Sequence, residues 1–520
     1  MESRLLNALL DPNAYDEPTA SVQLVQTHVS FLFLTDTFVY KIKKPVDFGF
    51  LNFTTLDRRR FYCEEEVRLN RRLCPDMYLG VVEVREFADG VCFDGRGQII
   101  DYAVKMKRLP AERMLDRLLD EEAVSEQDIG RIARTIGEFH LGAERNREID
   151  AYGSIDVVRR NWTENFLQIA DFVSRTLDET DLRIIRQWVE KFVEQQGSLF
   201  ADRVAGGFVR DCDGDIHSEN ICLTDRVYIF DCIEFNARFR FSDTAADLAF
   251  LLMDLEYRGR RDLAEILLRE YRAVTGDHGM VAVLDFYRVY RAFVRGKVES
   301  FRLDDPQIGE PEKEAACNSA RRHFRLARGY ILRRSLAPGL IVFSGLMGTG
   351  KSTLARELSF ELGLELLSSD ILRKELAGLS DTEHRRDGYN EGIYTIDFTR
   401  KTYREMFRRA EELLSCGRGV ILDASFSRRI DRAEAAALAQ RMAVRYSLFH
   451  AECPDDVARQ RLEVRAEDPR EASDGRWELY ARQKDDFEPL AAPHESWQVV
   501  DTSLPVTESI VRILRNLGVM

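Results

Sequence analysis

The sequence has no long apolar run, no paired cysteine motif and no internal repeat. No stretch approaches the roughly 20 apolar residues that a membrane-spanning helix needs, so we expect no membrane segment. The first residues, Met-Glu-Ser-Arg-Leu-Leu-Asn, lack a basic segment followed by an apolar core, and we therefore expect no signal peptide. The nine cysteines are scattered, without a C-x-x-C pair or a metal-ligand spacing, which favours free thiols in a reducing cytoplasm.

The composition is that of a soluble globular protein. The chain has 520 residues, of which 45% are hydrophobic and 32% are charged, so we expect two or more folded domains. The net charge of −14 argues against a protein that coats nucleic acid. It is compatible with a local basic cleft for a phosphorylated ligand. The oligomeric state is not indicated.

The most informative segment is Leu-Ile-Val-Phe-Ser-Gly-Leu-Met-Gly-Thr-Gly-Lys-Ser, residues 340–352. An apolar run leads into the pattern G-x-x-x-x-G-K-S, and helical periodicity follows. This is a phosphate-binding loop (Walker A) between a strand and a helix. Backbone N–H groups of such a loop and the positive end of the helix form a nest for a polyanion. The predicted nucleotide-binding residues are Gly345, Gly348, Thr349, Gly350, Lys351, Ser352 and Thr353.

The chain is predicted to divide near residue 336, where Pro338-Gly339 precedes the phosphate loop. We expect one domain over residues 1–335 and another over 336–520. In the second domain strands alternate with helices, which predicts a five-stranded parallel sheet in an α/β fold. The expected strands are Leu340–Ser344, Leu364–Ser368, Gly419–Ala424, Arg445–His450 and Trp497–Asp501.

Three further segments of the second domain suit phosphoryl transfer. Asp370 follows the second strand, Asp423 ends the third, and Arg461 and Arg465 lie four residues apart on one helix face. We expect Asp370 to accept the proton of an acceptor hydroxyl and Asp423 to help Ser352 hold Mg²⁺. The arginines would neutralise charge in the transition state. The alternatives are helix-capping acids and a solvated basic face.

These segments, with the phosphate loop, resemble the small P-loop kinases near gluconate kinase, polynucleotide kinase and the zeta-toxin-type enzymes. The resemblance covers about residues 338–520 and implies that the arginines form a lid over the phosphates. It implies a kinase that uses ATP and Mg²⁺.

The first domain begins differently. Residues 31–43 read as a β-hairpin, a charged helix runs from Thr54 through Leu73, and strands follow at Val81–Phe87 and Tyr102–Met106. The chain is then mostly helical to about residue 335, apart from strands around residues 208–232. A small sheet followed by a helical lobe is a kinase-like α+β order.

One motif of the first domain carries chemistry. In Asp215-Ile-His-Ser-Glu-Asn220 an Asn follows an Asp by five residues, and the strand Val227-Tyr-Ile-Phe then ends at Asp231. We expect Asp215 to accept the acceptor proton, and Asn220 and Asp231 to hold Mg²⁺. The motif resembles the aminoglycoside phosphotransferase-like (choline-kinase-like) proteins, over about residues 20–300. Asp213 stands where that family usually has His.

A nucleotide-binding lysine is expected on a strand, paired with a helix glutamate. Lys41 and Lys43 lie on one strand face because side chains alternate. We choose Lys41, because Val39 suits an adenine roof. Among three consecutive glutamates we choose Glu66, which shares a helix face with Leu69 and Leu73.

The sequence therefore predicts an ATP- and Mg²⁺-dependent phosphotransferase in the cytoplasm. It would act on a hydroxyl of a small metabolite and carry a second kinase-like nucleotide site in its first domain. The whole chain resembles a bacterial fusion of a phosphotransferase-like domain with a P-loop kinase domain. Two alternatives stay open. One is a nucleic-acid 5′-end kinase, which would need a basic channel; the residues that would contribute to it locally are Arg373, Lys374, Arg385 and Arg386. The other is an ATP sensor with an N-terminal pseudokinase.

Overall fold

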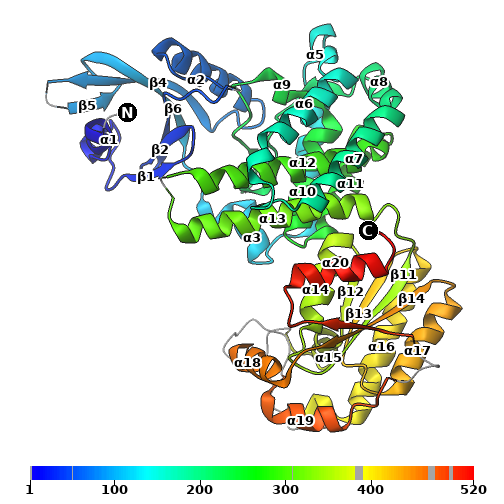
Figure 1. Ribbon diagram of the computed structural model, residues 1–520. Coiled ribbons are helices and arrows are strands. Elements are labelled where there is room, and N and C mark those ends of the chain that lie inside the picture. Colours follow the sequence, from blue (N-terminus) through cyan, green and yellow to red (C-terminus); the bar gives the residue numbers. More distant parts are fainter. Residues whose placement is uncertain are drawn as a thin grey trace. The chain divides into compact units, whose positions relative to one another are not determined.

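The computed structural model describes residues 3–49, 51–88, 90–306, 308–380, 391–465, 475–490 and 496–520. The chain forms two units, Met1–Ala327 and Arg328–Met520, which Figure 1 colours from blue to green and from green to red. The division falls within helix α13 (Glu310–Leu332). The boundary predicted at residue 336 follows this helix and stays a prediction.

The first unit begins with a curled sheet of six strands in the order β1-β2-β3-β6-β4-β5, paired antiparallel throughout. The strands are β1 (Gln23–Gln26), β2 (Ser30–Leu34), β3 (Phe38–Lys43), β4 (Tyr78–Phe87), β5 (Gly90–Phe93) and β6 (Gln98–Lys107). The predicted hairpin is β2–β3, and the two other predicted strands are β4 and β6.

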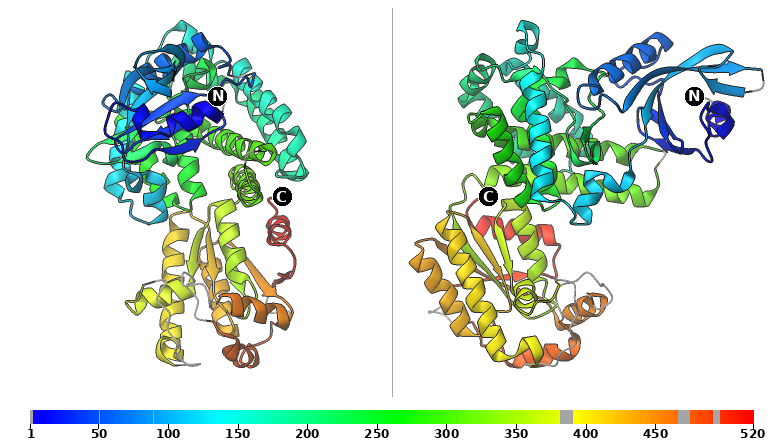
Figure 2. Two further views of the ribbon diagram at one scale, coloured as in Figure 1. Left: turned by 90° about the vertical axis from the view of Figure 1, so that its left-hand side faces the viewer. Right: turned by 180° about the vertical axis from the view of Figure 1, so that it is seen from behind.

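Helices cover both faces of this sheet (Figure 2). Helix α1 (Ser3–Leu9) packs on the face that carries Tyr40 and Ile42 of β3. Helix α2 (Leu56–Asn70) packs on the opposite face through Cys63 and Val67. Because side chains alternate along a strand, Lys41 and Lys43 lie on the α2 face. The helix begins at the N-cap Thr55, whose side chain accepts from the Arg58 N–H, one residue after the predicted Thr54.

The rest of the first unit is helical, with two short antiparallel strand pairs. The helices are α3 (Leu115–Asp120), α4 (Glu126–Gly142), α5 (Arg147–Ala151), α6 (Ile155–Gln168), α7 (Glu179–Gln195), α8 (Gly197–Ala205), α9 (Ala237–Arg240), α10 (Thr244–Tyr257), α11 (Arg261–Thr275) and α12 (Val281–Phe301). The strand pairs are β7 (Val209–Asp211) with β10 (Phe241–Asp243), and β8 (Ile221–Leu223) with β9 (Val227–Ile229).

The second unit has the predicted five-stranded parallel sheet, in the order β12-β13-β11-β14-β15. The strands are β11 (Gly339–Ser344), β12 (Glu365–Ser368), β13 (Val420–Asp423), β14 (Arg445–Glu452) and β15 (Gln498–Asp501). The helices are α14 (Lys351–Leu362), α15 (Ser369–Leu376), α16 (Ile396–Ser415), α17 (Arg429–Arg441), α18 (Asp455–Arg465), α19 (Trp477–Asp485) and α20 (Val506–Asn516). All five predicted strands are confirmed.

Helices flank this sheet on both faces, with α14 and α20 on one and α16 and α17 on the other (Figures 1 and 2). The core on the second face joins apolar residues of β11 and β13 to those of α16 and α17. Burial on both faces explains why the central strands are continuous apolar runs. Within the described residues, no helix is both long and apolar enough to cross a membrane.

One glycine sets the spacing between α13 and α14 in the second unit. A Cβ at Gly329 would overlap the backbone carbonyl of Glu361, so the two helices can approach closely only with glycine there. We expect Gly329→Ala to lower the free energy of unfolding of this unit by about 1–3 kcal/mol, because neither backbone can yield without repacking.

Urea unfolding followed by circular dichroism measures this change. The control is Gly130→Ala, because a Cβ at that α4 position meets nothing within 4 Å and alanine favours the helix by roughly 0.5–1 kcal/mol. Equal effects of the two substitutions would contradict the close approach at Gly329.

Candidate functional site

The phosphate loop joins the end of β11 to the start of α14. Gly350 is the N-cap of α14 and has a φ of 81°. A Cβ at Gly345 would lie 2.7 Å from the Ala451 carbonyl oxygen, and one at Gly348 would lie 2.8 Å from that of Ala458. The loop is therefore packed against β14 and α18 in a way that requires glycine at these positions.

A cavity of about 260 Å³ opens at the start of α14. Its lining combines loop and helix residues with residues of α18 and of the segment after β15: Gly348, Gly350, Lys351, Ser352, Thr353, Leu354, Arg356, Arg461, Arg465, Thr502, Leu504, Val506 and Ser509. Among the described residues that line it, four side chains are cationic and none is a carboxylate. The cavity thus presents positive charge at a helix N-terminus, which favours an anionic ligand.

Both predicted lid arginines line this cavity, in different states. The Arg461 guanidinium donates to the Thr502 hydroxyl at 3.2 Å and to the Thr502 carbonyl at 2.6 Å. The Thr502 hydroxyl in turn donates to the Thr349 carbonyl at 2.6 Å, so Arg461 is fixed to the phosphate loop. Nη2 of Arg465 is buried and has no hydrogen-bond partner within the described chain. That donor is the one best placed to gain from a ligand.

The predicted acids lie at the carboxyl ends of β12 and β13. Asp423 is buried and hydrogen-bonds to the Ser352 hydroxyl. Its Oδ1 has no hydrogen-bond partner among the residues that the structure describes. Burial raises the pKa of Asp423, and the nearby charge of Asp370 adds to this, while the charge of Lys351 opposes it. A hydroxyl beside an incompletely satisfied carboxylate fits Mg²⁺, which prefers oxygen ligands.

Asp370 lies in the first turn of α15, whose N-cap is Ser368, so it does not cap the helix.

Two predicted loop residues do not line the cavity. The Gly345 N–H donates to the Ser425 carbonyl at 3.2 Å, and the Thr349 hydroxyl donates to the Leu346 carbonyl at 2.8 Å. Both shape the loop. Arg385 and Arg386 lie outside the described residues.

In the first unit the predicted lysine and glutamate are in contact. Nζ of Lys41 lies 2.9 Å from Oε1 of Glu66, and it also forms an ion pair with Asp231. Burial alone would raise the pKa of Glu66, but the charges of Lys41 and Lys43 lower it to about 2. Asp231 has a φ of 65°, an unusual backbone conformation for a residue other than glycine.

The predicted base and one predicted metal ligand also meet. Nδ2 of Asn220 donates to Oδ2 of Asp215 at 3.2 Å and to the Asp215 carbonyl at 3.1 Å. Nε2 of His217 lies 3.5 Å from the same Oδ2. Burial raises the pKa of Asp215, but the charge of His217 holds it below its ordinary value. The Phe230 N–H donates to the Asn220 carbonyl at 3.1 Å, which ties this loop to the segment that ends in Asp231.

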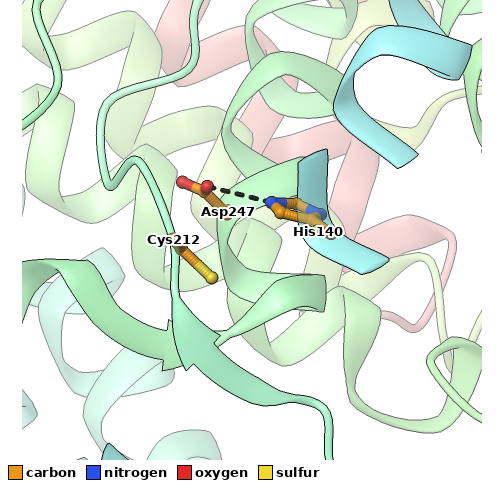
Figure 3. Close-up of side chains that lie close together, drawn as sticks. All are labelled: His140, Cys212 and Asp247. Atoms are coloured by element: carbon orange, nitrogen blue, oxygen red, sulfur yellow. Dashed lines mark hydrogen bonds and ion pairs between the residues drawn. The ribbon is translucent and has the colours of Figure 1, made fainter. Parts of the chain in front are cut away.

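A buried network holds the start of this loop (Figure 3). The two oxygens of Asp247 accept from the backbone N–H groups of Asp213 and Gly214 at 3.0 and 2.9 Å. His140 lies against Asp247 at 3.1 Å and against the Tyr271 hydroxyl at 2.8 Å. Sγ of Cys212 lies close enough to complete a metal-ligand set. Since these groups already have hydrogen-bond partners, we interpret the cluster as structural.

Asp213 is wholly enclosed, at 1% exposed. Its Oδ1 accepts from the Asp215 N–H at 3.2 Å. Burial raises the pKa of Asp213 well above its ordinary value, and the charge of Asp247 is the second cause of this rise. This buried acid, which stands where the resembled family has His, accepts a hydrogen bond from the backbone of the predicted base.

Sequence reasoning missed several residues of both sites. Arg356 lies one helical turn after Ser352, so its place beside the cavity could have been inferred from spacing. Thr502 follows the last strand, and no local motif marks it. Lys43 lies on the same strand face as the predicted Lys41, and sequence reasoning missed Glu234, which forms an ion pair with Lys43.

The raised pKa of Asp213 predicts a pH-dependent stability. Because this pKa is higher in the folded chain than in the unfolded chain, the free energy of unfolding falls as pH rises from the unfolded pKa of about 4 toward the folded value. Asp213→Asn removes this cost while keeping an acceptor for the Asp215 N–H. We expect the variant to match the wild type at acidic pH and to unfold roughly 2 °C or more higher at pH 8.

Thermal unfolding at pH 4 and pH 8 tests this expectation. Asp156→Asn is the control, because that side chain is 85% exposed. A variant that is destabilised equally at both pH values would show that Asp213 is charged in the folded protein.

Part of the second unit is similar to a family of known proteins. Residues 340–490 match the AAA domain family. Similar solved structures include a sugar kinase from Janibacter sp. HTCC2649 (22% identity, 35% of this chain and 95% of that chain, TM-score 0.28). Another is a gluconokinase from Sinorhizobium meliloti 1021 (18% identity, 35% of this chain and 93% of that chain, TM-score 0.27). A third is the APS kinase of Mycobacterium tuberculosis (19% identity, 35% of this chain and 99% of that chain, TM-score 0.26).

Two relatives match nearly the whole chain. They are Rv2004c of Mycobacterium tuberculosis (strain H37Rv) and Mb2027c of Mycobacterium bovis, each described as an uncharacterized protein. Each is 32% identical over 499 residues, which cover 95% of this chain and 95% of the relative. The similarity therefore includes both units, and the chain belongs to the same protein family as these mycobacterial relatives.

Proposed function

We propose that the second unit is an ATP-dependent kinase that transfers the γ-phosphate to a hydroxyl of a small metabolite. The observation that carries this proposal is the cavity at the start of α14, with four cationic side chains and no carboxylate among its described lining residues. Phosphoryl transfer depends mainly on positioning and on neutralising charge. Lys351 supplies positive charge at the start of α14, and Arg461 is held by Thr502. Nη2 of Arg465 is a donor without a hydrogen-bond partner among the described residues.

The acids at the strand ends support the choice of transfer over mere binding. Ser352 and Asp423 would hold Mg²⁺, which when bound neutralises charge on the phosphates. Asp370 lies close enough to raise the pKa of Asp423, and it lies on the helix that starts after β12. We assign to Asp370 the role of accepting the acceptor proton.

We further propose a second kinase-like nucleotide site in the first unit. Lys41 would contact the phosphates, Asn220 and Asp231 would hold Mg²⁺, and Asp215 would accept the acceptor proton. Support comes from the contacts that join Lys41 to Asp231 and Asn220 to Asp215. Glu66, held between two lysines, would orient Lys41.

An acceptor screen tests the second unit. The full chain, with ATP and Mg²⁺, is assayed for ADP release against polyols, sugar acids, nucleosides and an oligonucleotide with a 5′-hydroxyl. We expect one class of small hydroxyl compounds to stimulate turnover, and Lys351→Ala to reduce kcat/KM for it by about 100-fold or more. Lys401→Ala, at an exposed position of α16, is the control.

The outcomes separate the candidate functions. Stimulation only by the oligonucleotide would replace the metabolite kinase with a nucleic-acid kinase. Turnover that no acceptor stimulates would favour a nucleotide sensor. Wild-type turnover by Lys351→Ala would remove the catalytic role of the second unit.

Asp215→Asn in the same screen tests the first unit. If the first unit transfers phosphate, we expect this change to abolish transfer to one acceptor that Lys351→Ala still phosphorylates, because the isosteric amide cannot accept a proton at that position. The folded state is checked by the thermal unfolding curve. A full acceptor profile that survives Asp215→Asn would show that the first unit does not catalyse transfer, as in a pseudokinase.

A further inference from the structure

Two lysines and three acids form a linear chain of ion pairs on the α2 face of the first sheet. Glu66 contacts Lys41 through Oε1 at 2.9 Å and Lys43 through Oε2 at 2.6 Å. Lys41 continues to Asp231, and Lys43 continues to Glu234. The side chains of Glu66 and Lys43 are 0% and 1% exposed. Water therefore cannot stabilise either charge, and each depends on its partners.

Only one end of this chain of ion pairs reaches solvent. The Asp231 side chain is 45% exposed, whereas the Glu234 side chain is 7% exposed. The Lys41–Asp231 contact is thus the one that a ligand entering from solvent can replace. Lys43 and Glu234 form the other arm of the chain of ion pairs, and their side chains are only 1% and 7% exposed.

The backbone around Glu66 is fixed independently of these charges. Arg72, just after α2, donates to the carbonyls of Asp211 and Cys212 at 2.8 and 2.9 Å. Oδ1 of Asn70 accepts from the Cys232 N–H at 3.0 Å. Because α2 is tied at this end to the loops on either side of the proposed site, the backbone that carries Glu66 stays in place when the partners of Glu66 change.

We propose that Lys43 and Glu234 are positioning residues that hold Glu66 compensated while Lys41 turns to the phosphates of a bound nucleotide. This inference rests on the proposed nucleotide site of the first unit and deepens it. When the phosphates attract Lys41, Glu66 keeps Lys43 as its counter-ion. Glu234 is the second acid that neutralises the positive charge of Lys43. Without Lys43, Glu66 would hold Lys41 as its sole cation and compete with the phosphates for it.

The competition predicts a reversal of sign between two genetic backgrounds. In the otherwise unchanged site, Glu66→Gln weakens nucleotide binding, because Lys41 loses the carboxylate that orients it. Lys43→Met alone weakens binding by roughly tenfold or more. Added to Lys43→Met, Glu66→Gln strengthens binding, because it frees Lys41 from an uncompensated carboxylate. A purely structural defect at Lys43 predicts no such reversal.

Isothermal titration of the full chain with Mg²⁺ and a non-hydrolysable ATP analogue measures the effect. All variants carry Lys351→Ala, and the signal lost on Lys41→Met is assigned to the first unit. The control is Lys105→Met, since Lys105 lies on the neighbouring strand β6 and pairs with Glu17 at 3.4 Å, apart from the chain of ion pairs. We expect the analogue to bind Lys105→Met with wild-type affinity and Lys43→Arg more tightly than Lys43→Met.

If Lys43→Met alone fails to fold, the double variant Lys43→Met/Glu234→Gln is used instead, because it removes one positive and one negative charge from the buried set. It is measured with and without Glu66→Gln. Binding that is insensitive to Lys43, or weakened by Glu66→Gln equally in both backgrounds, overturns the role of Lys43 and Glu234 and leaves the nucleotide site standing. Absence of any signal that depends on Lys41 overturns the nucleotide site together with this inference.

Discussion

A charge buried in protein must find an opposite charge or a dense set of hydrogen bonds, and both candidate sites are built on this constraint. In the first unit the constraint is met internally. Glu66 is enclosed between two lysines, and each lysine has a second acid. In the second unit it is met only in part, since Nη2 of Arg465 and Oδ1 of Asp423 lack partners within the described chain. The ion pairs around Glu66 therefore hold their geometry without a ligand. The groups of the second unit that lack partners gain the most stabilisation when a ligand binds.

Rigid backbone supports the charges in both units. The Ser425 carbonyl accepts from the Gly345 N–H and from the Ser344 hydroxyl, at 3.2 and 3.1 Å, so the phosphate loop is fixed to the segment after β13. In the first unit Asp247 fixes the two N–H groups before Asp215, and Arg291 donates to the Gly214 carbonyl at 2.8 Å. Groups fixed in this way lose little freedom when a ligand arrives, which is the basis of preorganised electrostatics.

Much of the second unit could be predicted because its signals are local. Continuous apolar runs and a glycine-rich turn mark β11 and the phosphate loop within a few residues. Parallel alternation then places Asp370 and Asp423 at one edge of the sheet. The place of Thr502 beside Arg461 could not be predicted, because it depends on how β15 and α18 pack.

The first unit was harder to predict, since its site joins residues far apart in the chain. Lys41 and Asp231 are separated by 190 residues, and nothing local encodes their contact. The alternation of β3 does indicate that Lys43 shares the face of Lys41. The position of Glu234, the partner of Lys43, depends on the turn after β9, where Asp231 adopts a positive φ. The face of β3 on which the lysines lie could therefore be predicted from the sequence, but their distant ion-pair partners could not.

The two sites also show what net charge can and cannot say. The chain carries −14, yet the cavity at the start of α14 is lined by four cationic side chains. Salt screens exposed charges beyond about 8 Å under physiological conditions, so a ligand inside the cavity responds to its lining and not to the distant acidic surface. A strongly acidic chain can therefore hold a polyanion. What its net charge opposes is an extended contact with a polyanionic partner, where many surface acids would lie against phosphates at once.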